Sequence, residues 1–292
     1  MKKLLLIIGL LILMSGCSTR LLYPNLDWII PFYIDDYISL DNEQDNQLDN
    51  ELISLLGWHC QTQLPAYSGT LRILALELEA TPGSLTTEQI GSYAKRFEEH
   101  WDMLLGRLLP QGAELLGSAS DSQVTELIEN LEQGNVKFRE KYVEIEPDEV
   151  QQTRTSDMVD TLERWVDPLT RVQKQRIEEW SLQMEDIGKE RLKHRMLLVD
   201  EFSKIVVDRN SSATYQQDLV ALLVDLDVTR SPEYIEMLQN NRTRTHRLLV
   251  DLYVTLDQEQ HQQLTKNILS LAKDFDALAC QTVEQTQPVV DD

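Results

Sequence analysis

Apolar residues recur along most of this chain at steps of three and four positions, the period of an α-helix with one buried face. The clearest stripe consists of Ile90, Tyr93, Ala94, Phe97, Trp101, Leu104, Leu105 and Leu108. Pro110 follows this stripe, and because proline breaks the helical ladder the pattern predicts that the helix ends there. Runs of β-branched residues are few, and Gly and Pro together make up only 20 of 292 residues. The pattern therefore predicts an all-α fold.

Two further stretches extend this prediction toward the C-terminus. The longest segment without proline begins at Leu169, and we expect it to be helical to about Asp208, with Gly188 as a possible bend; Ser211-Ser212 is expected to start the next helix. The last apolar stripe advances by steps of 4, 3, 4 and 3. Its members are Leu264, Ile268, Leu271, Phe275 and Leu278. This spacing is typical of a coiled-coil seam and predicts that the last helix packs on a partner helix.

A short polar motif precedes five of the predicted helices. An apolar residue is followed by Asp, Ser or Thr, and a Gln stands three positions after that cap. The cap and glutamine pairs are Asp41 and Gln44, Thr86 and Gln89, Ser120 and Gln123, Thr170 and Gln173, and Asp257 and Gln260. In this capping box the cap oxygen accepts a free backbone N–H, and the Gln reaches back to the N–H of the cap. The five motifs are unevenly spaced, which does not indicate a solenoid of fixed period.

These elements predict an elongated bundle of antiparallel helical hairpins. Short breaks between the helical stretches favour such hairpins, since a short loop can only reverse the chain direction. We expect a helical domain over residues 41–282, with Asn210 marking a possible boundary between sub-lobes 41–209 and 211–282. Residues 283–292 are polar, and we expect a disordered tail there.

The N-terminus has the layout of a secretory signal peptide. Lys2 and Lys3 precede a largely apolar run over residues 4–13, which is too short for a transmembrane helix. The run leads to Ser15-Gly16-Cys17, which resembles the lipobox of bacterial lipoproteins, with Met14 in place of the usual aliphatic residue. This resemblance implies that residues 1–16 are removed and that Cys17 is the lipidation site. Ser18, rather than Asp, follows the cysteine, which by analogy favours the periplasmic side of the outer membrane.

An aromatic segment follows within residues 17–40, the expected lipidated N-terminus. After a short tether over residues 18–23, five of the nineteen aromatic residues occur close together: Tyr23, Trp28, Phe32, Tyr33 and Tyr37. Such rings are favoured at the level of lipid headgroups. The alternative is a short helix, broken at Pro31, that packs under the helical body. Three aspartates in the segment oppose insertion and favour this alternative.

The charge of the chain excludes one class of partner. The formal net charge is −22, and removal of residues 1–16 takes two lysines away and makes it −24. So acidic a protein repels phosphate backbones, and we predict no nucleic-acid binding. Most of these charges are expected on solvated helix faces.

Two cysteines remain after Cys17, and the sequence leaves their state open. Cys60 and Cys280 either pair in an oxidising compartment or stay as separate buried thiols. A disulfide would join the first long helix to the last, and it requires Cα atoms within about 7 Å.

A search for chemistry finds no catalytic motif. Phosphate-binding glycine loops, nucleophile elbows and paired zinc ligands are missing from the sequence. Glu190 and His194 stand four residues apart, but a zinc site needs two further ligands, and a surface ion pair explains them better. His59 and Cys60 are adjacent on a helix, so their side chains diverge by about 100° and do not form a dyad easily. We expect no enzyme, no metal and no cofactor.

Two family resemblances complete the sequence picture. Several motifs resemble an uncharacterised family of proteobacterial helical lipoproteins. They lie at residues 15–20, 26–31, 35–37, 58–59 and 64–67 and in the closing Leu256-Asp257-x-Glu259-Gln260 helix. The Leu-Thr-x-x-Gln motifs at residues 85–89 and 169–173 are similar to those of the Spy and CpxP periplasmic proteins, which are all-α and bind other proteins. Together these features favour a membrane-anchored envelope lipoprotein that binds an unidentified envelope protein. The alternative is a structural spacer without a client.

Overall fold

The structure, a computed structural model, describes residues 16–80 and 83–280, and within these ranges it is helical and contains no strand. The all-α prediction is thus confirmed. The predicted tail at 283–292 and the apolar run of the predicted signal peptide lie outside the described residues. The helices are α2 (Gly16–Leu22), α3 (Leu26–Asp35), α4 (Asn42–Trp58), α5 (Leu64–Ala80), α6 (Thr87–Gly117), α7 (Asp121–Tyr142), α8 (Pro147–Glu163), α9 (Arg171–Gln183), α10 (Gly188–Val207), α11 (Tyr215–Val224), α12 (Pro232–Val254) and α13 (Gln258–Leu278). None of the helices in the described ranges combines the length and the apolar composition needed to cross a bilayer.

Three short turns of other helical types complete the described chain. A 3-10 turn, η1 (Tyr23–Asn25), joins α2 to α3, and a second, η3 (Leu226–Thr229), precedes α12. A π-helical turn, η2 (His59–Gln63), lies between α4 and α5. Because α4, η2 and α5 follow one another without a break, residues 42–80 form one long helical element.

All five predicted capping boxes are present. In α4, α6, α7, α9 and α13 the cap side chain accepts from the backbone N–H of the Gln, and the Gln side chain accepts from the backbone N–H of the cap. Each such cap stabilises its helix by about 1 kcal/mol. Ser231 caps α12 in a related way, with Pro232 in the first helical position.

Several predicted helix boundaries are wrong. The helix α6 continues through Pro110 to Gly117, and α3 contains Pro31 without a break. At Pro110 the residue four positions earlier is Gly106, and both are exposed. The carbonyl that loses its helical donor is therefore open to water, which lowers the cost of the proline. Gly188 does not bend a helix but begins α10, and α11 begins at Tyr215 rather than at Ser211.

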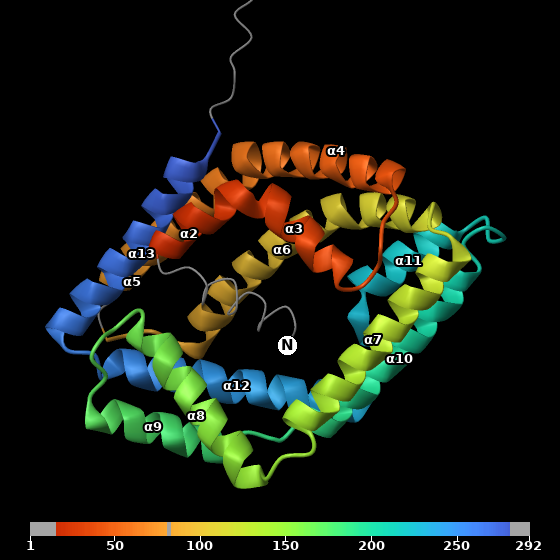
Figure 1. The fold of residues 1–292 in the computed structure, drawn as a ribbon. Coiled ribbons are helices and arrows are strands. Elements are labelled where there is room, and N and C mark those ends of the chain that lie inside the picture. Colours follow the sequence, from red (N-terminus) through yellow and green to blue (C-terminus); the bar gives the residue numbers. More distant parts are fainter. Residues whose placement is uncertain (1–15, 81–82, 281–292) are drawn as a thin grey trace, which may run out of the picture.

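The helices pack in a bundle, as predicted, and follow one another around a closed, frame-like outline (Figure 1). The main pairings join segments far apart in sequence: α5 with α13, α7 with α10, and α6 with both α11 and α12. Among helices adjacent in sequence, α8 packs on α9 and α10 packs on α11. The apolar seam of α13 packs on α5, so the last helix has a partner helix, as its spacing predicts. The boundary predicted near residue 210 falls between α10 and α11. Helices before and after this boundary pack together, as α11 does with α6.

Three clusters of buried side chains form the core. The first lies between α5 and α13 and includes Leu64, Leu71 and Phe275. The second joins α6, α7, α10 and α11, and the third joins α9 to α12. Separate clusters are the expected result of a frame-like arrangement, because each pair of adjacent helices buries its own apolar faces.

Candidate functional site

The predicted tether is an ordered helix that is fixed to the last helix of the fold. Residues 16–22 form α2, which packs on α13. Arg20 Nε donates to Asp274 Oδ1 at 2.6 Å, and the Asp274 side chain is buried. A buried carboxylate requires such a partner, because an unpaired charge away from water is costly. The position of the predicted lipidation site, Cys17 in α2, is therefore set relative to the helical body.

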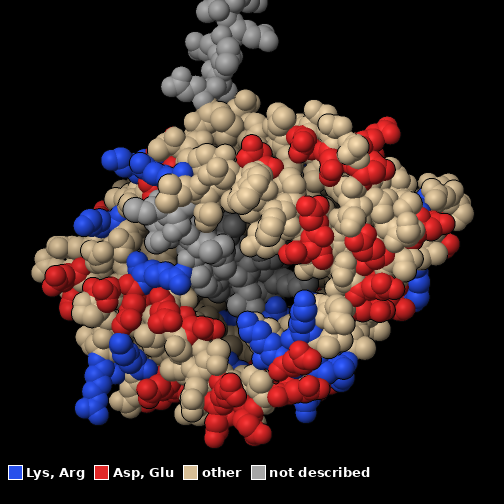
Figure 2. Space-filling model, in the orientation of Figure 1, with Lys and Arg blue, Asp and Glu red and all other residues tan. Residues whose placement is uncertain are grey.

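The helix α3 has two different faces. Ile30 and Ile34 face α4 and α6, where they line an apolar groove. On the other side Trp28, Phe32 and Tyr33 are 71%, 61% and 62% exposed. In Figure 2 the surface over the start of α3 is largely uncharged, with acidic side chains beside it. Of the five aromatic residues predicted near the membrane, only Tyr23 is half-buried, since Tyr37 is also exposed.

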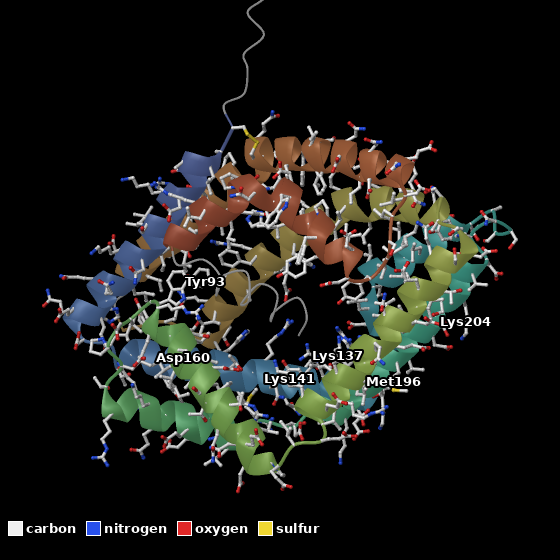
Figure 3. The ribbon with its side chains drawn as sticks, in the orientation of Figure 1. Tyr93, Lys137, Lys141, Asp160, Met196 and Lys204 are labelled. Carbon is white, nitrogen blue, oxygen red and sulfur yellow. A yellow bond between two sulfur atoms is a disulfide. The ribbon has the colours of Figure 1, made fainter. Side chains whose placement is uncertain are left out.

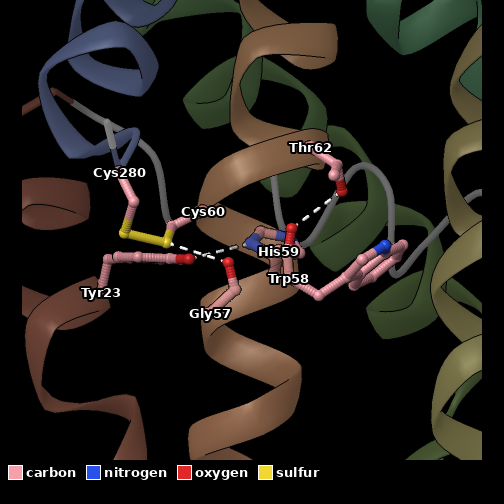
Figure 4. The surroundings of a disulfide bond; sticks show 7 residues. All are labelled: Tyr23, Gly57, Trp58, His59, Cys60, Thr62 and Cys280. Carbon is pink, nitrogen blue, oxygen red and sulfur yellow. Dashed lines mark hydrogen bonds between the residues drawn. A yellow bond between two sulfur atoms is a disulfide. The ribbon is translucent and has the colours of Figure 1, made fainter. Parts of the chain in front are cut away.

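Tyr23 is held by a histidine on the π-helical turn. Its hydroxyl lies 3.0 Å from His59 Nδ1 (Figure 4). The hydroxyl of Tyr67 lies 3.3 Å from His59 Nε2. A π-helical turn inserts one extra residue into the helix and redirects its side chains, and such turns are frequent at functional sites. Here the turn places His59 between a tyrosine of the N-terminal segment and a tyrosine of α5.

The same turn carries one half of a disulfide. Cys60 is bonded to Cys280, which follows α13, and their Cα atoms are 5.1 Å apart (Figure 4). The backbone N–H of Cys280 also donates to the carbonyl of Cys60 at 3.1 Å. The sequence leaves open whether the two cysteines pair or stay as separate thiols, and in the structure they form a disulfide. Since the thiol of Cys60 is consumed, the pair His59 and Cys60 provides no nucleophile.

Burial sets the protonation of this cluster. Desolvation lowers the pKa of His59 to about 4, so the imidazole is neutral near pH 7. Burial also raises the pKa of Tyr23 and of Tyr67 to about 12. A neutral imidazole has one N–H donor and one acceptor nitrogen, which suits two tyrosine hydroxyls. Tyr67 further packs edge-on against His100, whose Nε2 lies 2.9 Å from the hydroxyl of Thr70.

An apolar groove of about 140 Å³ lies between α3, α4 and α6. Seven aliphatic side chains line it: Ile30, Ile34, Leu48, Leu52, Leu55, Leu108 and Leu115. Arg107 and Glu51 also border it and supply the charged groups. Its size suits one or two apolar side chains of a partner rather than a small-molecule substrate, for which sites are usually larger.

No cluster of three metal-ligating side chains occurs in residues 16–80 and 83–280. Glu190 and His194 serve other contacts: Glu190 pairs with Lys193 at 2.5 Å, and His194 Nδ1 lies 3.0 Å from the Thr229 hydroxyl. Charges on the helix surfaces form similar local pairs. Lys204, labelled in Figure 3, lies 2.7 Å from carboxylate oxygens of both Asp200 and Glu201. These contacts are typical of solvated faces.

The capping glutamines have a second role, which their positions in the sequence do not reveal. Gln44 and Gln123 exchange side-chain hydrogen bonds between α4 and α7, and Gln173 and Gln260 do so between α9 and α13. Each amide nitrogen also donates to a backbone carbonyl two residues before the partner's cap. These acceptors are Ser118 for Gln44, Ser39 for Gln123, Thr255 for Gln173 and Pro168 for Gln260. We call the two pairs the first and the second glutamine clasp.

One sequence feature could have indicated these clasps: every one of the five capping boxes uses Gln. Glu also completes a capping box, and it is frequent in this acidic chain. Only an amide both accepts from its own cap and donates across to another helix. The sequence alone does not say which boxes meet.

The chain belongs to a family of unknown function, DUF6279, whose model matches residues 36–235. Searches of curated proteins and of solved structures returned no significant match. The matched range contains the first clasp, Gln173 and Cys60. It ends before Gln260 and Cys280, the partners that close the second clasp and the disulfide. The family supplies no activity, so function has to be argued from the surfaces described above.

Proposed function

We propose that this protein is a lipoprotein held by acylated Cys17 on the periplasmic side of the outer membrane, where it binds another envelope protein. The lipobox-like Ser15-Gly16-Cys17 and the following Ser18 support the anchor and its location. The role is one in maintenance or assembly of the envelope and involves no catalysis. The observation that carries the binding role is the apolar groove between α3, α4 and α6.

The groove has the features of a site for an apolar side chain of a partner. Its floor is aliphatic, whereas Arg107 and Glu51 provide charged groups at its border. Interfaces combine an apolar centre with a polar rim in this way. An amphipathic helix docks into such a groove through side chains spaced by three and four residues. Leu108 lines the groove and is 41% exposed, so part of the lining remains available for contact.

A photo-crosslinking pair tests the binding role. A photoreactive side chain replaces Leu108 in the groove, and in the control it replaces Met103, which lies on the same helix, is 46% exposed and does not line the groove. We expect a discrete protein adduct in native envelopes from position 108 and none from position 103. Equal adducts from both positions, or none from either, contradict the proposal and favour a spacer without a client.

A groove-filling variant sharpens that experiment. Gly112 lines the groove, and a Cβ atom built there meets no atom within 4 Å. The Cβ atom of Gly112→Leu therefore has room, and we expect the rest of the side chain to occupy the groove; the change also favours the helix. We expect this variant to fold normally and to lose the adduct from position 108. An adduct of unchanged strength shows that the partner does not use the groove.

The anchor is tested separately. We expect mass spectrometry of the purified mature protein to find acyl chains on Cys17 and no residues before it. The variant Cys17→Ser is expected to lose the lipid and to leave the membrane fraction. Membrane retention of unlipidated Cys17→Ser contradicts the lipid anchor.

A further inference from the structure

We propose that the outer face of α3, formed by Trp28, Phe32 and Tyr33, lies on the bilayer surface into which the acyl chains of Cys17 insert. This inference rests on the proposed lipidation of Cys17 and adds a fixed orientation of the protein on the membrane. The occupant of the exposed aromatic face is thus the lipid headgroup layer rather than a protein.

The three side chains form one continuous aromatic surface. The rings of Trp28 and Phe32 stack with centroids 6.3 Å apart, and Phe32 meets Tyr33 edge-on at 6.1 Å. Leu21, at the end of α2, is as exposed as Trp28, at 71%. Clustered exposed apolar groups mark interaction or membrane surfaces, whereas single ones do not. Trp and Tyr are the residues favoured where hydrocarbon meets water.

The connection to Cys17 selects the bilayer as the occupant. Cys17 and Leu21 are one turn apart in α2, which corresponds to about 6 Å along the helix axis. A flexible tether would let the domain turn any face to the membrane. Here Arg20 forms an ion pair with Asp274, and Tyr23 lies within hydrogen-bonding distance of His59, so the segment that leads to α3 is attached to the helical body in α2 and again in η1. Acyl chains that enter the bilayer at Cys17 bring the face of α3 to its surface.

The charge of this region defines the kind of membrane contact. Residues 21–71 contain eight Asp and Glu and no Lys or Arg. An anionic surface therefore repels this region, and the contact depends on apolar and aromatic burial. Asp35 and Asp36, at the end of α3, are exposed and are expected to remain in water. The proposal thus specifies a zwitterionic surface and a binding mode that added salt does not weaken.

Quenching by brominated lipid tests the orientation. The mature acylated protein is placed in phosphatidylcholine vesicles with brominated acyl chains, which quench tryptophans at the bilayer. Trp28 is the most exposed of the five tryptophans. We expect quenching of the wild type, loss of that quenching in Trp28→Phe, and no loss in Trp165→Phe. Persistence of the quenching in Trp28→Phe overturns the inference.

A second pair of variants tests the surface around Trp28. Phe32→Asp introduces a charge beside Trp28, and we expect it to reduce the quenching. Leu182→Asp is the control, because Leu182 on α9 is 71% exposed, the same value as Trp28. Equal effects of the two variants overturn the inference, as does stronger quenching in anionic vesicles at low salt. Dimers of the acylated wild type that Phe32→Asp dissociates would assign the face to a second copy and overturn it as well.

The outcome separates this inference from the proposed function. Acyl chains found on Cys17 together with an unquenched Trp28 leave the anchor intact and reject the orientation. An unmodified Cys17 rejects the proposed anchor itself, because the acyl chains are then missing.

Discussion

The two glutamine clasps have the same hydrogen bonds but different surroundings. In the second clasp both amides are buried, with Gln173 at 0% and Gln260 at 4% exposure. In the first clasp Gln44 is buried, whereas Gln123 is only half-buried. A third case is Gln89, whose box caps α6 and has no clasp partner among the described residues. The same local motif thus only caps its helix at Gln89, whereas in the two clasps it also joins helices that are far apart in the sequence.

The comparison shows why the amide matters where helix starts meet. Each clasp brings two helix N-termini together, and their partial positive charges repel. In each clasp one cap is an aspartate and the other carries a hydroxyl: Asp41 with Ser120, and Asp257 with Thr170. The two glutamine oxygens add further acceptors between the helix ends. A clasp therefore satisfies the backbone groups of two helices at once.

The largest effect is expected from the disulfide, which ties one helix of each clasp to the other clasp. Helix α13 carries Gln260 and ends two residues before Cys280, and α4 carries Gln44 and ends two residues before Cys60. Replacing Cys60 and Cys280 with Ala frees a loop of about 220 residues, and we expect a loss of about 5 kcal/mol in unfolding free energy. Urea denaturation measures this loss. Unchanged stability would show that packing of α5 on α13 holds this region alone.

Changing one glutamine to glutamate breaks the second clasp selectively. Gln173→Glu keeps the size and the acceptor for its own cap but places a buried carboxylate against the oxygen of Gln260. We expect a loss of about 3 kcal/mol at pH 7, measured by urea denaturation. The same change in the first clasp, Gln123→Glu, is expected to cost about half as much, because that side chain is half-buried. Equal costs would show that burial does not distinguish the clasps.

Acid is expected to weaken the disulfide side of the molecule. The pKa of His59 is about 4 in the folded protein and near 6.5 unfolded, so the unfolded state binds more protons between these values. The contribution of neutral His59 is complete above pH 6.5 and is lost as the pH falls toward 4. We expect a loss of up to about 3 kcal/mol. Denaturation at pH 7 and pH 4.5 of the wild type and His59→Gln isolates this part.

Hydrogen exchange, compared between different helices, provides the control for that experiment. Hydrogen exchange is expected to rise in α5 and α13 at low pH before it rises in α7 and α11, which lie in the second cluster. A uniform rise in exchange would indicate general acid unfolding rather than an effect of His59.

The smallest effect is expected at the unclasped box. Gln89→Glu retains the capping acceptor and adds a negative charge near the start of α6, where the helix dipole favours it. We expect a change within about 0.5 kcal/mol of zero by thermal or urea denaturation. A cost near that of Gln173→Glu would mean that Gln89 also contacts a partner.

The sequence predicts the local part of this structure well. Helix starts follow from caps because a cap and its glutamine are three residues apart, and all five were found. The prediction that a helix ends at Pro110 is wrong. The free-energy cost of a proline inside the helix depends on whether the carbonyl of Gly106 is open to water, which is a property of the folded surface. The sequence predicts a tether over residues 18–23, but residues 18–22 belong to a helix that is fixed by the pair of Arg20 with Asp274, two positions 254 apart. The candidate site shows the same limit: the aromatic residues are evident in sequence, and their exposure is not.

The disulfide has one consequence for a protein that meets proteases. Cys60 and Cys280 close a covalent ring that contains every residue between them. A single cut anywhere in that ring, including the loop at residues 143–146 or the turn at 208–214, leaves one connected molecule. The two pieces separate only after reduction, so a nicked protein migrates as one chain on a non-reducing gel and as two on a reducing gel. Damage to a loop of the frame therefore does not release the remainder from the N-terminal segment.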